Sequence, residues 1–373
     1  MRKFAFMEKL LDGVAVEWRP LEQLAKIRHG KDWKGLGAGD IPIYGSGGIM
    51  GYVDTYSYNR PSVLIPRKGS ITNVFYLETP FWNVDTIFYT EIDESKIIPK
   101  FLYYFIKTID LMALDTGSGR PSLTQAILNQ IKIPIPCPEN PKKSLEIQAE
   151  IVRILDTFTE LTAELTAELT ARKKQYNHYR DQLLSFEDGD VEWKTLGEVL
   201  QMRAGQHISA SKIMPNSSDE YSYPCFGGNG VRGFVENKSH NGEHLLIGRQ
   251  GALCGNVQRI KGQFYATEHA VVVTISNEID IDWAFHMLTV MKLNQYASQS
   301  AQPGLAVGNL QRLNIPLPSI SEQKRVAYIL DKFDALTNSF AEGLPREIEL
   351  RQKQYEYYRD LLLSFPKPEE VEA

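Results

Sequence analysis

The glycine-rich segment at residues 226–230 is the part of the chain that comes nearest to a catalytic motif. Phe226-Gly227-Gly228-Asn229-Gly230 matches F-x-G-x-G, a pattern of adenine methyltransferases whose glycines let the backbone approach a cofactor. The related segment Tyr44-Gly45-Ser46-Gly47-Gly48 breaks this pattern, and the Asn-Pro-Pro-aromatic motif that would supply the catalytic residues is absent from the sequence. A glycine-rich turn between two strands explains the segment better.

Other catalytic patterns are equally incomplete. Glu94-Ser95-Lys96 resembles the end of a nuclease motif but has no suitable Pro-Asp before it, so a surface loop is expected. The sequence has no G-x-x-x-x-G-K-[ST] motif for ATP, its histidines lack metal-ligand spacing, and its three cysteines form no C-x-x-C pair. We therefore expect no catalytic residue, no cofactor site and no metal site in this chain.

DNA recognition is the chemistry that the remaining polar residues suit, because cations bind phosphate and guanidinium or amide groups bind base edges. Two sets of candidates follow, one in each half of the chain. The first set is Lys31, Lys34, Tyr44, Arg60, Arg67, Lys68, Asn73 and Arg120, and the second is Arg203, Gln206, Lys212, Asn229, Arg232, Lys238, Arg249, Gln250 and Gln302. For each of them, a solvated side chain without DNA contact is the alternative.

Net charge is distributed unevenly along the chain. Residues 1–145 carry +3 and residues 195–321 are neutral, whereas 146–194 and 322–373 carry −5 and −3. The basic faces of two domains could thus bind DNA while the acidic segments face other partners, although exposed helices also collect glutamate without such a role. No apolar run is long enough to span a membrane and no signal core is evident, so a cytoplasmic protein without membrane contact is expected.

The sequence contains an internal duplication. Leu64-Ile65-Pro66-Arg67-Lys68-Gly69 matches residues 246–251, and Ile133-Pro134-Ile135-Pro136 matches residues 315–318, both at an offset of 182 residues. The polar segments 116–122 and 299–304 are also equivalent, with Arg120 exchanged for Gln302. A period of this length is too long for a solenoid repeat and predicts two whole domains with two different targets.

Each copy has the composition of a mixed α/β domain. Strands are expected over residues 52–58, 62–65, 86–90, 244–247 and 270–275, and short core helices over residues 101–106 and 283–288.

Two long helices join the copies. From Ile147 and again from Val326, apolar residues recur at three-and-four spacing as far as Phe186 and Phe365, which predicts coiled-coil seams that satisfy each other. About 40 residues at ~1.5 Å each give a rod of ~60 Å. Gly343 and Pro345 should interrupt or kink the second helix.

A four-residue iteration lies within the first helix. Thr-Ala-Glu-Leu occurs at residues 162–165 and again at residues 166–169. Each such unit changes the length of the helix by ~6 Å and shifts the seam as a stutter does.

Taken together, these features resemble the specificity subunit of a type I restriction-modification system over essentially the whole chain. The resemblance rests on the paired Ile-Pro-x-Pro segments, the helix starts from Gln148 to Phe158 and from Gln323 to Phe333, the Tyr-x-x-Tyr-Arg-Asp-x-Leu-Leu-Ser-Phe helix ends and the Thr-Ala-Glu-Leu iteration. It implies an α+β fold in which two similar mixed α/β target-recognition domains are separated by two long antiparallel helices forming a coiled coil. The segment 8–13 resembles the junction 182–189, which makes the pseudo-twofold repeat circular.

The resemblance also implies boundaries and partners. The first target-recognition domain would span residues 1–145, the first spacer helix 146–186, the second domain 187–321, the second spacer helix 322–366, and a tail 367–373. The chain would read a split, asymmetric site in double-stranded DNA and carry no chemistry of its own. Two modification subunits would supply S-adenosylmethionine-dependent methylation of adenine, and restriction subunits would add translocation and cleavage driven by ATP with Mg²⁺.

Two rival functions remain. The chain could be a stand-alone DNA-binding or adaptor protein that dimerises through its coiled coil, which would need no assembly with modification subunits. It could also be a self-contained methyltransferase, a function that the missing catalytic motif disfavours.

Overall fold

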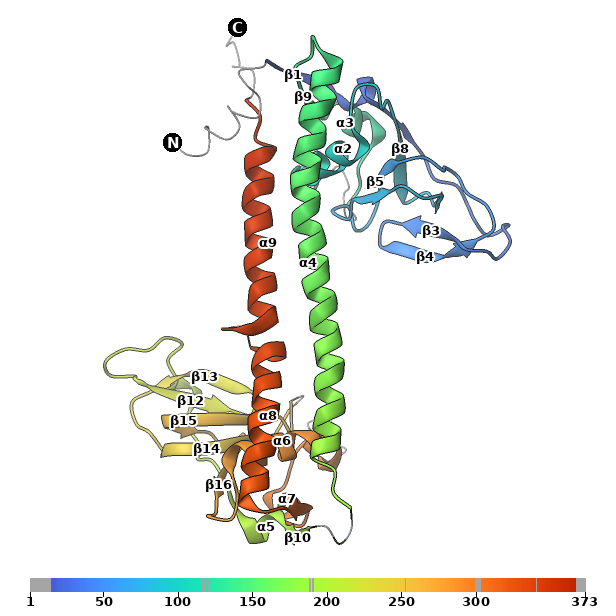
Figure 1. Ribbon diagram of the computed structural model, residues 1–373. Coiled ribbons are helices and arrows are strands. Elements are labelled where there is room, and N and C mark those ends of the chain that lie inside the picture. Colours follow the sequence, from blue (N-terminus) through green and yellow to red (C-terminus); the bar gives the residue numbers. More distant parts are fainter. Residues whose placement is uncertain are drawn as a thin grey trace. The chain divides into compact units, whose positions relative to one another are not determined.

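The computed structural model describes residues 15–115, 119, 121–187, 189, 191–251, 253–298, 303–339 and 341–366 (Figure 1). The chain forms two compact units. Unit 1 comprises Met1–Glu164 and Ile348–Ala373, and unit 2 comprises Leu165–Glu347. Each unit has its own apolar core, so each is described separately.

Unit 1 combines small sheets, antiparallel except for the parallel pair β3 and β7, with short helices. Its sheets have the strand orders β2-β8-β5-β6, β4-β3-β7 and β1-β9. The strands are β1 (Val16–Pro20), β2 (Ala25–Arg28), β3 (Ile41–Gly45), β4 (Gly48–Val53), β5 (Ser62–Pro66), β6 (Phe75–Leu77), β7 (Trp82–Asn83), β8 (Ile87–Ile92) and β9 (Lys132–Pro136). The short helices are η1 (Leu21–Gln23), α2 (Pro99–Ile106) and α3 (Gln125–Asn129).

Unit 2 repeats this plan with a larger sheet. A six-stranded sheet has the order β11-β16-β14-β15-β12-β13, and β10 pairs with β17. The strands are β10 (Glu192–Thr195), β11 (Leu200–Ala204), β12 (Tyr223–Gly227), β13 (Gly230–Val235), β14 (His240–Gly248), β15 (Val257–Ala266), β16 (Ala270–Ile275) and β17 (Asn314–Leu317). The short helices are α5 (Leu196–Val199), η2 (Ala210–Lys212), α6 (Ile281–Val290), η3 (Leu293–Tyr296) and α7 (Val307–Gln311).

The two units differ in one ladder. In unit 2 the strand β15 pairs antiparallel with β14 and parallel with β12, and so joins the sheet into one. In unit 1 two separate strands make these pairings, because β6 pairs antiparallel with β5 and β7 pairs parallel with β3. Pro80 lies between those strands and Pro61 precedes β5. Because proline has no N–H to donate to a ladder, these two residues account for the interruption.

Most of the predicted short elements are confirmed. The predicted strands at 62–65, 86–90, 244–247 and 270–275 correspond to β5, β8, β14 and β16, and the predicted helices to α2 and α6. The strand predicted over 52–58 is wrong beyond Val53, where β4 ends. There the backbone leaves its hairpin partner, and the N–H groups of Ser57 and Tyr58 donate to the carbonyl of Phe81. This long-range pairing has no local sequence signal.

The first long helix, α4 (Pro141–Leu183), begins six residues before Ile147, where the apolar seam was predicted to start. The Asn140 side chain accepts a hydrogen bond from the backbone N–H of Lys143 at 3.1 Å. Proline at the first helical position lacks only an N–H that has no helical partner there. The Asn-Pro pair was therefore the true start signal, ahead of the apolar seam.

The second long helix is divided in two, as Gly343 and Pro345 predict. Helix α8 (Ile320–Asn338) ends before Gly343, at which α9 (Gly343–Leu362) begins. Gly343 has φ +81°, and a Cβ at this position would lie 2.4 Å from the carbonyl oxygen of Ala335. A residue with a side chain therefore cannot occupy this break without a shift of the backbone.

Antiparallel helix pairing is present in both units. In unit 1, Ile147, Ile151 and Leu155 of α4 share a core with Leu362 and with Phe365, which follows α9. Further along α4, Phe158 stacks on Tyr358 with ring centroids 5.2 Å apart. In unit 2, Tyr176 and Tyr179 of α4 pack against Phe333 of α8. The predicted fold class, with mixed α/β domains and long antiparallel helices, is confirmed.

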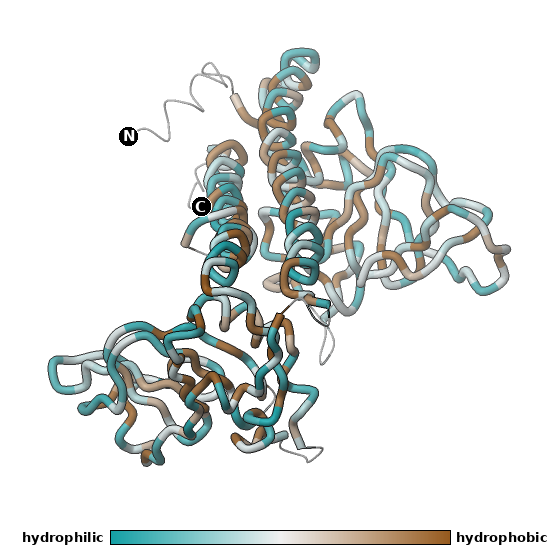
Figure 2. The backbone as a smooth tube through the Cα atoms, turned by 60° about the horizontal axis from the view of Figure 1, so that its bottom comes forward, coloured by the Kyte–Doolittle hydropathy of each residue, from teal (hydrophilic) through white to brown (hydrophobic). Residues whose placement is uncertain are grey.

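Figure 2 shows the seam as short hydrophobic stretches that recur along these helices. The Nε1 of Trp18 in β1 also donates to the carbonyl of Pro366 at 2.8 Å, which joins the two ends of the described chain as a circular repeat predicts. The segment 8–13, on which that prediction partly rests, lies outside the described residues.

A buried glutamine attaches each long helix to its domain. Gln148 in α4 accepts from the N–H of Ile98 at 2.9 Å and donates to the carbonyl of Lys96 and to Ser144 Oγ. Gln323 in α8 accepts from the N–H of Asp280 at 2.8 Å and donates to the carbonyls of Glu278 and Pro318. Both side chains are fully buried. An unpaired buried amide costs about 1–3 kcal/mol, so these contacts fix the helix on the segment before α2 or α6.

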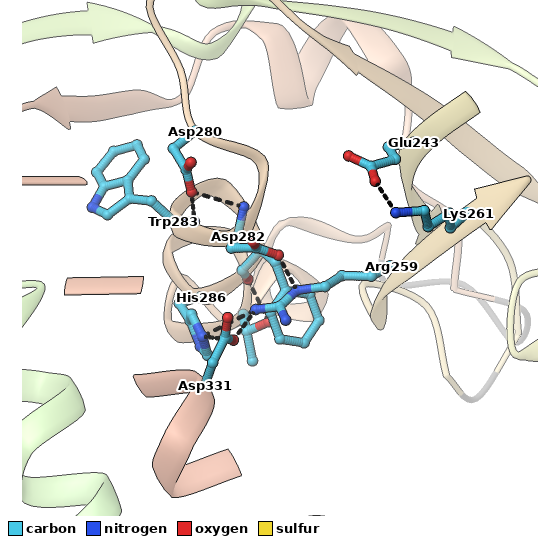
Figure 3. A network of polar contacts seen from close by, with 10 residues as sticks. Glu243, Arg259, Lys261, Asp280, Asp282, Trp283, His286 and Asp331 are labelled. Carbon is cyan, nitrogen blue, oxygen red and sulfur yellow. Dashed lines mark hydrogen bonds and ion pairs between the residues drawn. The ribbon is translucent and has the colours of Figure 1, made fainter. Parts of the chain in front are cut away.

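An aspartate about two turns further along each helix makes a second attachment. In unit 2, Asp331 contacts both His286 Nε2, at 2.8 Å, and the guanidinium of Arg259, which also pairs with Asp282 (Figure 3). In unit 1, the equivalent Asp156 accepts from the hydroxyl of Tyr104 at 2.6 Å and from Lys100 at 2.8 Å. Tyr104 and His286 occupy equivalent positions in α2 and α6. Each unit therefore contains the same contact to its aspartate, made by a different side chain.

This difference predicts that unit 2 loses stability in acid. Burial lowers the pKa of His286, an effect to which Arg259 adds and which Asp331 opposes. The unfolded chain, with a histidine pKa of ~6.5, then binds the proton more readily than the folded unit. The free energy of unfolding should therefore fall as the pH drops below ~6.5. In H286Y, which carries the residue found in unit 1, this dependence should shrink in urea unfolding between pH 8 and pH 5.5.

The exposed His178 provides a matched control, because H178N should leave the pH dependence unchanged. An equal acid-induced loss in wild type and H286Y would show that another group is responsible.

Candidate nucleic-acid interface

Two hairpins with the same backbone design form the best-matched part of the two units. Strands β3 and β4 pair with a register shift between Ile43 and Tyr44, and β12 and β13 with a shift between Cys225 and Phe226. Gly48 and Gly230, which follow the turns, have φ +109° and +101°. The F-x-G-x-G segment at 226–230 is therefore a hairpin turn, and its glycines serve backbone geometry.

A second pair of glycines in these hairpins makes room for side chains. A Cβ on Gly45 would lie 2.5 Å from the sulfur of Met50, and a Cβ on Gly227 would lie 2.7 Å from Cδ of Arg232. Met50 and Arg232 thus lie flat across the glycine of the facing strand, and both are exposed.

The loops after β5 and β14 lie next to the hairpins and also share their backbone contacts. The N–H of Arg67 donates to the carbonyl of Thr86, and that of Arg249 to the carbonyl of His269, both at 2.8 Å. Gly69 and Gly251 follow with φ +83° and +87°. These hydrogen bonds show that Thr86 and His269 are equivalent positions. The constant offset of 182 residues would instead pair Thr86 with Glu268.

In unit 2 the hairpin and this loop surround a hollow of about 420 Å³. The hollow brings together three of the predicted DNA-binding residues, Asn229, Arg232 and Gln250. Their amide and guanidinium groups are the kinds that bind base edges. His269 also lines it, although its position relative to the other histidines had suggested no role.

A chain of polar contacts lies beside the hollow. His269 Nδ1 is 2.7 Å from Gln250 Oε1, and its Nε2 is 3.5 Å from Glu268 Oε1. His207 Nδ1 contacts the same carboxylate oxygen at 3.0 Å. Burial of Glu268 acts to raise its pKa, but hydrogen bonds from its own backbone and from His207 outweigh burial and lower it. The carboxylate is thus charged near neutral pH.

The corresponding surface of unit 1 has different side chains on the same frame. The backbone N–H of Ser46 donates to Thr86 Oγ1 at 3.3 Å, and Asn73 donates to the carbonyl of Ser46 at 3.1 Å. Tyr44 packs against Phe75, and burial raises the pKa of its hydroxyl. Lys68 is exposed in the position equivalent to Gln250. Tyr44, Lys68 and Asn73 of the predicted set therefore lie on or beside this hairpin.

Arg67 and Arg249, also predicted to bind DNA, are half-buried and partly engaged within their own units. Arg67 Nη1 donates to the carbonyl of Asp85 at 3.4 Å, and Arg249 Nε donates to the carbonyl of Leu305 at 3.3 Å. Each guanidinium has five N–H donors, so further donors remain for a phosphate. Each of these arginines also braces its loop.

The other predicted residues that the structure describes do not line the hollow of unit 2. Arg60 lines a hollow of mixed charge, where Lys26 and Lys96 lie with Glu22, Glu91 and Asp93. Lys212 lines a different hollow beside His207 and Asn237. Lys238 lies 5.9 Å from the ring centre of Tyr223. Four further residues are exposed. Arg203 lies in β11, Gln206 follows β11, and Lys31 and Lys34 follow β2.

Arg120 and Gln302 lie outside the described residues, so their predicted role in base recognition stays a prediction. Across the part of the chain that the structure describes, no group of His, Cys, Asp and Glu could hold a metal ion. No described helix is long and apolar enough to cross a membrane. Cys137, Cys225 and Cys254 are free thiols.

Comparison with known proteins identifies the family. The type I restriction modification DNA specificity domain matches the chain twice, at residues 14–172 and 189–350. The chain belongs to this family. A specificity subunit of the type I restriction enzyme EcoprrI from Escherichia coli is 51% identical over 92% of this chain and 93% of its own length. The EcoR124I/EcoR124II specificity subunit, from the same species, is 37% identical over the full length of both chains.

Solved structures agree with the fold. A type I restriction-modification S subunit from M. genitalium superposes with a TM-score of 0.68 at 16% identity, covering 95% of this chain and 98% of that one. The family and its relatives make this chain a DNA-sequence recognition subunit of a type I restriction-modification system and not an enzyme. The alternative of a self-contained methyltransferase is thereby set aside.

Lys68 offers a direct test of phosphate contact, because it is exposed beside the unit 1 hairpin. K68A should weaken binding to cognate and non-cognate DNA alike and reduce the salt slope by about one unit, because one released counterion is lost. Titrations of labelled duplexes at several salt concentrations would measure both effects. K142A, which removes an exposed cation from the first turn of α4, should change neither. An unchanged salt slope in K68A would remove this residue from the DNA interface.

Proposed function

We propose that this specificity subunit recognises a split, asymmetric site in double-stranded DNA, with each unit reading one half. The target-recognition domains would span residues 1–145 and 187–321, with spacer helices at 146–186 and 322–366 and a tail at 367–373. The residues proposed to contact DNA are the two predicted sets, of which those around the hairpins have the strongest support.

The observation that carries this proposal is the duplicated hairpin frame with different side chains. The register shifts, the positive-φ glycines and the loop hydrogen bonds are shared by the two units. Met50 is replaced by Arg232 and Lys68 by Gln250 on that frame. A shared frame supports docking on the same kind of ligand, and different reading groups support different base sequences.

We propose further that the chain assembles with two modification subunits and with restriction and translocase subunits in the cytoplasm. S-adenosylmethionine, ATP and Mg²⁺ would bind to those partners. A solved structure similar to this chain, with a TM-score of 0.60 at 14% identity, is described as addressing complex assembly and conformational transition of the type I R-M system. Coexpression with the modification subunits, followed by sequencing of adenine methylation, tests both the assembly and the site.

A stand-alone DNA-binding or adaptor protein is the rival to this assembly. The rival requires no stable complex with modification subunits, so a failure of coexpressed subunits to co-purify would favour it. A bipartite methylation motif that depends on this chain would exclude it.

The spacing between the two half-sites would depend on α4. The Thr-Ala-Glu-Leu units at 162–165 and 166–169 lie within this helix, and Leu161, Leu165 and Leu169 are half-buried at successive four-residue steps. One further unit adds ~6 Å and a rotation of ~400°, which overshoots one full turn by only ~40°. The seam would therefore stay on nearly the same side of the helix.

Insertion of one Thr-Ala-Glu-Leu unit after Leu169 should thus lengthen the spacer of the methylated site by one or two base pairs, since the rise per base pair is ~3.4 Å. The two half-sequences should stay the same, because neither hairpin is changed. A methylome of the variant measures both properties. The length-preserving variant T166S/E168Q should keep the original spacing. Altered half-sequences at unchanged spacing would show that α4 is not the spacer.

A further inference from the structure

The hollow of unit 2 and the polar contacts beside it involve groups that the DNA-binding sets did not include. His269 and Glu268 stand beside Gln250, Arg232 and Asn229, and their contacts determine which hydrogen-bonding groups the hollow presents. This inference rests on the recognition function of the chain and concerns how one unit chooses its bases.

The orientation of the Gln250 amide is fixed by His269. Because Gln250 Oε1 is a carbonyl oxygen and only accepts, His269 Nδ1 must donate in their 2.7 Å contact. The Gln250 amide nitrogen then keeps both of its N–H groups for a ligand. Glu268 lies on the other side of the imidazole, 3.5 Å from Nε2, and is itself held by His207.

The other members of the hollow are also rich in donors. The Arg232 guanidinium has only donors. Its side chain lies close against Gly227, where a Cβ would collide with it. Asn229 is exposed at the turn. Val231 and Leu253 provide apolar walls and are 55% and 50% exposed. Among the bases, guanine presents two acceptors, N7 and O6, and no donor on its major-groove edge.

We propose that Gln250 and Arg232 read guanine in the half-site of unit 2, and that His269 is a positioning residue that keeps the Gln250 amide in its donor orientation. In unit 1 the equivalent positions hold Lys68, Met50 and Thr86. Thr86 Oγ1 accepts from the backbone of Ser46 and does not orient the residue at position 68. Unit 1 therefore lacks the guanine-reading pair that Gln250 and Arg232 form in unit 2.

The test uses the subunit assembled with its modification subunits and the cognate duplex identified from the methylome. Each guanine of the duplex is replaced in turn by 7-deazaguanine, which lacks N7. R232M identifies the half-site of unit 2. In the wild-type complex, replacement of at least one guanine in that half-site should weaken binding to the duplex by about 5- to 100-fold. In Q250A this replacement should cost less than in the wild-type complex, because one of the two proposed donors is gone.

Variants at position 269 separate positioning from mere folding. H269T, which carries the unit 1 residue, should weaken discrimination at the same guanine by roughly tenfold while leaving the other half-site and the thermal unfolding midpoint unchanged. K261A, at an exposed position in β15, should behave as wild type. M50R in unit 1 should alter preference only in the half-site that R232M leaves unaffected.

Three results would overturn the proposal. These are insensitivity of the wild-type complex to N7 removal in that half-site, an undiminished 7-deazaguanine penalty in Q250A, and a loss in H269T that is uniform across both half-sites. A wild-type complex without any sequence preference would instead contradict the recognition function itself, so the two failures are distinguishable.

Discussion

The attachment of each long helix to its recognition domain is the constraint on which the rest of the structure depends. A recognition surface can read a defined half-site only if its orientation on the helix is fixed. Gln148 and Gln323 provide that fixation, because each makes three hydrogen bonds from a fully buried position to the helix start and to the segment before α2 or α6. Burial makes these bonds costly to break.

The second attachment shows how a duplicated contact can diverge without loss of geometry. Asp156 and Asp331 occupy the same helical position and accept hydrogen bonds from the same place in α2 and α6. Tyrosine makes this contact in unit 1, beside Lys100, and histidine makes it in unit 2, beside Arg259. The hydrogen bond is retained in both, while the response to protons differs. Selection for position alone thus leaves the chemistry of the donor free to vary.

The same separation of frame and chemistry characterises the hairpins. Glycines at positions 48 and 230 satisfy a backbone conformation that other residues rarely adopt, and glycines at 45 and 227 leave space for the side chain of the facing strand. These positions cannot change without cost. Met50 and Arg232, by contrast, project from the frame and can be exchanged. A domain built in this way can acquire a new base preference while its fold and its attachment to the helix persist.

The sequence by itself determined the duplication, the mixed α/β class, the long antiparallel helices, the break at Gly343 and the absence of catalytic motifs. These properties are expressed in local composition, in apolar periodicity and in repeated segments, all of which a linear pattern records. The sequence was also sufficient to predict Asn229, Arg232 and Gln250 as DNA-binding candidates, because only some side chains can bind base edges.

Only the tertiary structure decided which of the candidates belong together. Arg60 lines a separate hollow of mixed charge, whereas His269 lines the hollow with Gln250, and neither placement has a signal in sequence spacing. It also decided that Thr86 and His269 are equivalent, that residues 54–58 leave the hairpin for Phe81, and that Pro61 and Pro80 divide the sheet of unit 1. Each of these outcomes arises from hydrogen bonds between segments far apart in the chain, whose pairing depends on the folded backbone and not on local propensity.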